Sequence, residues 1–276
     1  MNFRLALLAS ASLFVAAPAI AADPGLTADA QAFGIREDVN AMSISPDGAK
    51  AVYIAPAKDR WSAVVVVDLA KGTTKPILVS HGDPEVLRWC SFASNDRLVC
   101  RFTANVDSTG QLIGYSRLVS LNLDGSDVKE LGQRSSFYDA DLRQVDGSVL
   151  DWRPSQAGSI LMERDYVPEE GNSETRMVER RSGLGVDLVD VQTLKVTPLE
   201  TPRDGVEDYI TDGLGNVRAM TIAETNGTML TGRLKHFYRL PGSRDWKPLT
   251  DYVDEEDFRP LAVDATSNSL DRKSVV

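Results

Sequence analysis

Apolar residues along this chain come in short runs rich in Val, Ile, Leu, Tyr and Thr, which are separated by turns of Gly, Asp, Asn and Pro. This spacing is typical of β-strands joined by tight turns, and the periodicity of amphipathic helices is almost absent. Residues 26–34 (LTADAQAFG) are the exception and predict a short helical turn before Gly34. We therefore predict an all-β protein.

The strand pattern also repeats. Each copy has a pair of strands, then a strand ending in an apolar-Asp/Asn-Leu sequence, then a Gly or polar turn and a short fourth strand. The copies occupy residues 41–78, 86–131, 147–200 and 207–250, and residues 258–270 resemble the first strand and turn of a fifth. A repeat of about fifty residues is the length of a propeller blade. A β-sandwich or an open meander is the alternative, which the repeated order disfavours.

The predicted fold is thus an incomplete β-propeller of about four four-stranded blades plus the start of a fifth. We assign residues 41–270 to this partial propeller and residues 22–40 to an N-terminal lead-in. Blades bury their faces only against neighbouring blades, so the sheets are expected to pack in sequence order.

The first residues predict export. A positive segment (Met1–Arg4), an apolar segment (Leu5–Val15) and a small-residue cleavage site form a secretory signal peptide over residues 1–21. We expect cleavage after Ala21 or Ala22 and a periplasmic or secreted protein. No other stretch is long enough to predict a membrane span.

Composition limits the classes of partner. After the signal peptide about 250 residues remain, enough for one large β domain or two smaller ones. The net charge of −10 argues against nucleic acid or an anionic membrane as a partner, because both require a basic face.

Cys90 and Cys100 are the only cysteines, and they flank a predicted hairpin turn at Asn95-Asp96. With a three-residue loop the two cysteines lie directly opposite each other, a geometry that favours a disulfide in an oxidising compartment. Two free buried thiols are the alternative.

The sequence gives no pattern for catalysis, for a metal or for a cofactor. The nucleophile elbow G-x-S-x-G is absent, and each Gly-Ser pair is interpreted as a turn. His81 and His236 are the only histidines, and neither has the spacing of a metal ligand or a recognisable serine partner. We predict that this chain alone has no catalytic residue.

Two polar segments, residues 103–115 and 164–183, are predicted to be long loops between the second and third strands of their units. Long loops are often functional. In the second of them Glu169 and Glu170 could bind a substrate amine, and Arg180 and Arg181 could bind a carboxylate or pair with those acids. Solvated loop charges are the alternative.

Three stretches resemble the N-terminal region of secreted bacterial S9-family serine peptidases, the prolyl oligopeptidase group. They are residues 30–56, which contain the Ser45-Pro46-Asp47-Gly48 turn, residues 87–100 and residues 160–169. The resemblance covers about Gln31 to Leu261. It implies a propeller that limits access of short peptides to a C-terminal α/β-hydrolase domain, which carries the catalytic triad.

The pattern departs from that family after Leu270, before a ring would close. One reading of the codons for residues 271–276 (DRKSVV) matches a sequencing adapter, so we expect this segment to be an adapter artefact or a disordered tail. The hydrolase domain would then be missing. The alternative function is a TolB-like periplasmic binding scaffold without enzymatic activity, since such propellers share the Ser-Pro-Asp-Gly turn.

Overall fold

The computed structural model describes residue 29 and residues 32–152, 156–171, 178–249 and 259–273. The chain divides into two compact units, Met1–Arg36 and Glu37–Val276. The predicted signal peptide, residues 1–21, lies outside the described residues. Among the described residues, no helix has the length and apolar character that a bilayer crossing needs.

In the first unit, the described residues include a helical turn. Asp29, Ala32 and Phe33 are helical, in agreement with the prediction for residues 26–34.

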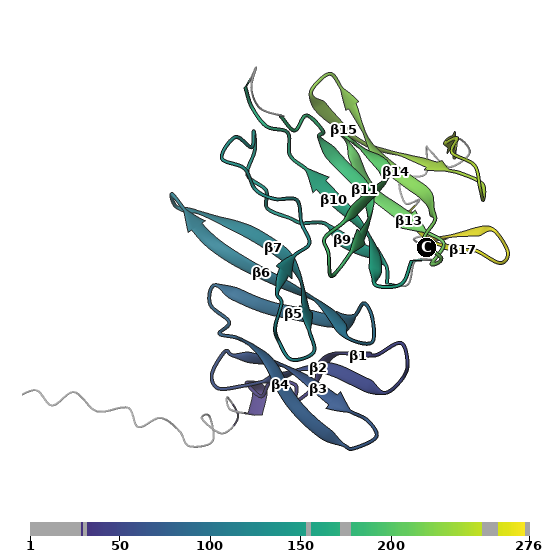
Figure 1. The fold of residues 1–276 in the computed structure, drawn as a ribbon. Helices are drawn as coiled ribbons and strands as arrows, with labels where there is room; N and C mark the ends of the chain where they lie inside the picture. Colours follow the sequence, from purple (N-terminus) through teal and green to yellow (C-terminus); the bar gives the residue numbers. More distant parts are fainter. Residues whose placement is uncertain (1–28, 30–31, 153–155, 172–177, 250–258, 274–276) are drawn as a thin grey trace, which may run out of the picture. The chain divides into compact units, whose positions relative to one another are not determined.

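Among its described residues, the second unit contains four antiparallel sheets of four strands, each built from strands that are consecutive in the sequence, and then a two-stranded sheet (Figure 1). We number them sheets 1 to 5. Sheets 1 and 2 comprise β1 (Asn40–Ile44), β2 (Lys50–Pro56), β3 (Ser62–Asp68) and β4 (Thr73–Ser80), then β5 (Glu85–Phe92), β6 (Arg97–Ser108), β7 (Gln111–Asn122) and β8 (Lys129–Glu130).

The remaining strands follow the same order. Sheets 3, 4 and 5 comprise β9 (Ser148–Asp151), β10 (Ser159–Tyr166), β11 (Gly183–Asp190) and β12 (Val196–Arg203), then β13 (Val206–Thr211), β14 (Val217–Asn226), β15 (Met229–Tyr238) and β16 (Lys247–Pro248), then β17 (Arg259–Asp264) and β18 (Ser269–Lys273). Four-stranded meanders in succession are the blades of a β-propeller. The predicted fold class is confirmed, with one sheet for each repeat.

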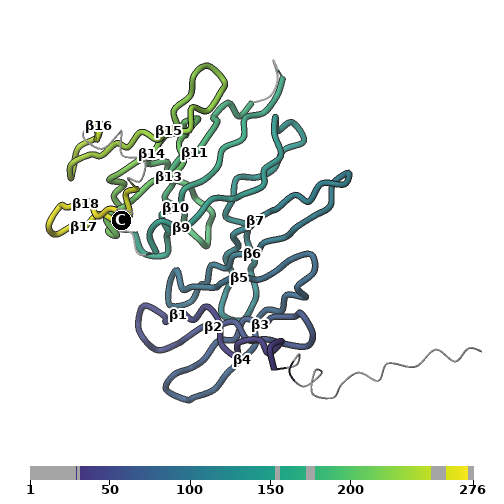
Figure 2. The backbone as a smooth tube through the Cα atoms, turned by 180° about the vertical axis from the view of Figure 1, so that it is seen from behind, coloured from purple at the N-terminus to yellow at the C-terminus, as the bar shows by residue number. Residues whose placement is uncertain are grey.

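The sheets share their cores with their sequence neighbours, as blades do. One apolar cluster joins Val52 and Val64 of sheet 1 to Leu98 of sheet 2. A second cluster joins sheets 2 and 3, and a third joins sheets 3 and 4. Figure 2 shows the same succession of sheets from behind.

Polar contacts cross the same boundaries. The Asp47 backbone NH donates to Asn95 Oδ1 (3.0 Å) between the turns of sheets 1 and 2. The buried Arg97 of sheet 2 donates from Nε to the carbonyl of Val191 in the turn after β11 (2.9 Å). The Thr211 hydroxyl of sheet 4 donates to Asp151 of sheet 3 (2.6 Å).

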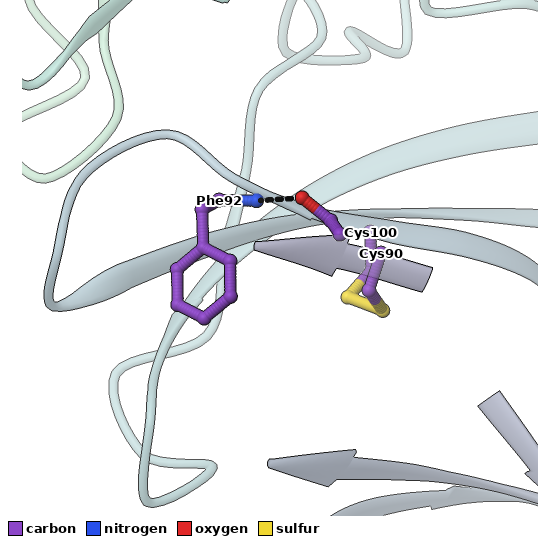
Figure 3. The surroundings of a disulfide bond; sticks show 4 residues. Cys90, Phe92 and Cys100 are labelled. Atoms are coloured by element: carbon purple, nitrogen blue, oxygen red, sulfur yellow. Dashed lines mark hydrogen bonds between the residues drawn. A yellow bond between two sulfur atoms is a disulfide. The ribbon is translucent and has the colours of Figure 1, made fainter. Parts of the chain in front are cut away.

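The disulfide prediction is confirmed. Ala93 NH donates to the Arg97 carbonyl, which leaves a three-residue loop, and the register pairs Cys90 with Cys100. The two cysteines form a disulfide that joins β5 to β6 (Figure 3). Both are buried in the core shared by sheets 1 and 2.

The prediction of a long loop at residues 103–115 is wrong. These residues extend β6 and β7, which pair from Arg97↔Asn122 to Ser108↔Gln111. Thr109 and Gly110 form the turn between them, and both have positive φ, as a tight hairpin turn requires. Polar residues such as Asn105 gave the segment the appearance of a loop, but the backbone hydrogen bonds of the hairpin hold them in strands.

Strand pairing also continues past Leu270, where the sequence pattern was expected to stop. β17 and β18 pair from Asp264↔Ser269 to Arg259↔Lys273, so residues 271–273 lie in a strand. Residues 274–276 lie outside the described part of the chain.

Candidate functional site

A cavity of about 840 Å³ lies between sheets 2 and 3. On the side of sheet 2 it is bounded by β8 and the segment that follows, and on the side of sheet 3 by β10, β11 and β12. Its charged lining residues are Lys129, Glu130, Arg134, Arg164 and Arg181, and its apolar floor includes Leu131, Val189, Leu194 and Val196.

Strand alternation places Arg164 in this cavity. Ile160, Met162, Arg164 and Tyr166 follow one another at every second position of β10, so their side chains share one face. Ile160 and Met162 belong to the core between sheets 2 and 3, and Arg164 and Tyr166 line the cavity beyond it. The same face therefore changes from apolar to polar where the core ends.

The Arg164 guanidinium is buried, with 8% of its side chain exposed. Its Nη1 donates to Asp187 Oδ2 (3.1 Å), and the Tyr166 hydroxyl donates to the same oxygen (2.6 Å). Burial, followed by the hydrogen bond to Asp187, raises the pKa of Tyr166 to about 12, so its hydroxyl remains a donor at neutral pH. Arg164 Nε is buried and has no acceptor among the described residues, although buried donors are normally paired.

Arg181 lies over the Tyr166 ring, with its guanidinium 4.5 Å from the ring centroid. Its Nε and Nη2 donate to the two carboxylate oxygens of Glu179, at 3.0 and 2.6 Å. This hydrogen bonding to Arg181 lowers the pKa of Glu179 to about 2. The ring and the carboxylate together fix the position of Arg181 at the edge of the cavity.

Of the loop residues proposed from the sequence, Arg181 alone is part of the described lining of the cavity. Glu169, Glu170 and Arg180 lie in the same segment. The Glu169 NH donates to the Glu179 carbonyl (2.8 Å), and the Glu170 NH donates to the Tyr138 carbonyl (2.7 Å). Arg180 NH donates to Glu179 Oε1 (3.0 Å).

Four residues that line the cavity were not predicted from the sequence: Lys129, Arg134, Arg164 and Tyr166. The signal for two of them was present, because Arg164 and Tyr166 continue the alternation of β10 into a segment interpreted as a loop. For Lys129 and Arg134 no signal was available, since only the packing of sheet 2 against sheet 3 brings them to the cavity.

The two histidines lie elsewhere. The His81 ring contacts the Trp61 ring in a tilted arrangement, with 4.2 Å between centroids. His236 is buried in β15, and its Nδ1 lies 3.0 Å from Thr221 Oγ1.

The cavity offers charges of both signs over an apolar floor. Lys129 pairs with Asp127 (2.9 Å), Arg164 with Asp187 and Arg181 with Glu179, while Arg134 has no counter-charge among the described residues. Such a site suits a zwitterionic ligand, whose anionic end meets guanidinium groups and whose cationic end meets the Glu130 carboxylate.

No family model matches this sequence, and no curated protein matches it. Among solved structures, a prolyl endopeptidase is similar at 15% identity with a TM-score of 0.45, over 82% of this chain and 32% of that one. TolB from Acinetobacter baumannii is similar at 17% identity with a TM-score of 0.34, over 74% of this chain and 41% of that one. This chain thus spans less than half the length of either protein.

A third similar structure is the β-propeller domain of the trilobed protease from Pyrococcus furiosus. It is 16% identical with a TM-score of 0.30, over 77% of this chain and 69% of that one.

Proposed function

We propose that this chain is the peptide-binding propeller of a secreted serine peptidase of the prolyl oligopeptidase group. In this proposal it limits access of short peptides to a C-terminal α/β-hydrolase domain and has no catalytic residue of its own. The observation that carries the proposal is the cavity between sheets 2 and 3, which presents guanidinium groups and a carboxylate above an apolar floor.

A short peptide matches these groups chemically. Its carboxylate would meet Arg134 and Arg181, and its ammonium group would meet Glu130 at the wall or Glu170 in the neighbouring segment. The rim arginines are exposed, so each contact contributes modestly, and affinity depends on several of them acting together.

An oxidising compartment is part of the proposal. The Cys90–Cys100 disulfide fits a periplasmic or secreted protein, because such bonds persist outside the reducing cytosol. The predicted signal peptide supports the same location. N-terminal sequencing of the exported protein should begin at Ala22 or Asp23; an intact Met1 in the mature protein would contradict export.

Calorimetric titration with trialanine tests the binding site. We expect the zwitterionic peptide to bind, and its C-terminal amide to bind about fivefold more weakly because one charged contact is lost. Arg134→Gln and Arg181→Gln should weaken trialanine by a similar factor and leave the amide unchanged. Arg233→Gln, an exposed arginine of β15, is the matched control.

Equal affinity for trialanine and its amide would overturn carboxylate recognition at this site. If no form of the peptide binds, the TolB-like scaffold is favoured, and a folded protein becomes the expected ligand. Peptide hydrolysis by this chain that a serine-reactive inhibitor abolishes would show that a catalytic site had been missed.

A further inference from the structure

A second cavity, of about 640 Å³, lies between sheets 3 and 4. It is bounded by β12 on one side and, on the other, by the start of β14 and the segment between β15 and β16. The charged residues of its described lining are four arginines and one glutamate: Arg203, Arg218, Arg239, Arg244 and Glu200.

Two of these arginines are held by acids. Arg239 Nη2 lies 2.6 Å from Glu200 Oε1, and its Nε donates to the Val217 carbonyl (2.6 Å). Arg218 Nη1 lies 3.7 Å from Asp212 Oδ2, and its Nε donates to the Arg239 carbonyl (3.0 Å). Both side chains are mostly buried, with 14% of Arg239 and 6% of Arg218 exposed, so these guanidinium groups are fixed in place.

The other two have no such partner. Arg203 and Arg244 are exposed, and neither has an ion pair or a side-chain hydrogen bond among the described residues. The cavity therefore carries two guanidinium groups beyond those that Glu200 and Asp212 balance. Among the described residues, this is a local excess of positive charge on a chain whose net charge is −10.

An aromatic wall adds a second kind of contact. Trp246 is half-buried and lines the cavity, and the Arg239 guanidinium lies 4.7 Å from its ring centroid. An indole ring offers a flat apolar surface, and the cation–π contact with Arg239 holds this one in position.

We propose that this cavity is a separate anion-binding site for a carboxylate carried on a ring whose face can pack on an indole. The carboxylate meets Arg203 and Arg244, whose planar guanidinium groups match its geometry, and the ring packs on Trp246. An aryl carboxylate and a sugar acid share this chemistry, and neither requires the peptide site between sheets 2 and 3.

Calorimetric titration with 2-naphthoate and with glucuronate tests the site and distinguishes the two sources. We expect at least one of them to bind, and its uncharged amide to bind about tenfold more weakly. Added salt should weaken the acid more than the amide.

Variants then locate the site. Arg203→Gln and Arg244→Gln should each weaken the bound acid by about fivefold, and Trp246→Leu should weaken acid and amide alike. Arg134→Gln, in the peptide site, and Arg233→Gln should leave the affinity unchanged. Because Arg203 and Arg244 are exposed and have no ion pair among the described residues, their substitution should preserve the fold.

Absence of binding by both acids would overturn the proposal, as would binding that Arg203→Gln and Arg244→Gln leave unchanged. If Arg134→Gln weakens binding of the acid instead, the acid binds in the cavity between sheets 2 and 3. The peptide proposal can fail while this one stands, because the variants expected to weaken the acid, at Arg203, Arg244 and Trp246, differ from those expected to weaken the peptide, at Arg134 and Arg181.

Discussion

Glu163 shows how a single side chain is set by its position in a blade. It lies on β10 opposite Ser148 of β9, and the Ser148 hydroxyl donates to its Oε1. Its Oε2 is buried and has no partner among the described residues. Burial is the main reason that the pKa of Glu163 is raised above its ordinary value of 4.5, and the nearby Asp208 carboxylate adds to the rise.

The raised pKa predicts a pH-dependent effect of Glu163→Gln. The protonated form of a carboxyl whose pKa is higher in the folded state stabilises the fold. This contribution is complete below pH 4.5, the ordinary pKa of a glutamate, and is lost as the pH rises through the raised pKa of the folded state. The neutral glutamine escapes this loss. We expect Glu163→Gln to be more stable than the wild type at neutral pH, with the difference shrinking in acid.

Urea unfolding at several pH values measures this effect. Glu85→Gln, at an exposed position, is the matched control. A Glu163→Gln variant that is destabilised equally at every pH would mean that the carboxylate is needed in its charged form.

At the scale of single residues, the sequence shows the charge of a side chain but not its position. Arg181 was proposed as a carboxylate ligand from its charge alone, and the structure places it at a cavity wall. Arg164 was not proposed, because its segment was interpreted as a loop. Its pairing with Asp187, which lies on a different strand, has no signal in the charge pattern. Pairing across strands is determined by register, which charge patterns do not reveal.

At the scale of elements, alternation and turn residues were sufficient where the strands are apolar. The valine run of β3 is buried from Ala63 to Val66, and the sequence identified it directly. The extensions of β6 and β7 were missed because Val106 and Leu112 are exposed there, so the alternation has no buried face to reveal it. Their pairing rests on backbone hydrogen bonds, which leave no pattern in the side chains.

The disulfide links two of these elements, β5 and β6, and its contribution to stability can be tested. Cys90 and Cys100 enclose a separation of 10 residues between two strands that are already paired. For a loop of this size, cross-linking of the unfolded chain stabilises the protein by about 2–3 kcal/mol. The double variant Cys90→Ser/Cys100→Ser should therefore have a free energy of unfolding about 2–3 kcal/mol lower than that of the wild type, as measured by urea unfolding.

The reduced wild type is the matched comparison. We expect reductant to lower the stability of the wild type towards that of the double variant and to leave the double variant unchanged. Equal stability of the oxidised wild type and the double variant would contradict a structural role for the bond.

At the scale of the whole molecule, function is expected where sheets meet. The sequence predicted the order of the sheets, because repeats of one length pack on their neighbours. It could not predict the cavities, which require side chains from two sheets at once. The sheet 3 residue Pro198 lines both the cavity between sheets 2 and 3 and the cavity between sheets 3 and 4. Its place in each cavity depends on the neighbouring sheet that completes that cavity.

Hydrogen–deuterium exchange with and without trialanine tests whether a short peptide binds between sheets 2 and 3. We expect bound trialanine to slow exchange in residues 129–134 and in the segment around Arg181, with no change in the β14–β15 hairpin. Protection confined to other sheets, or no protection at saturating peptide, would contradict it.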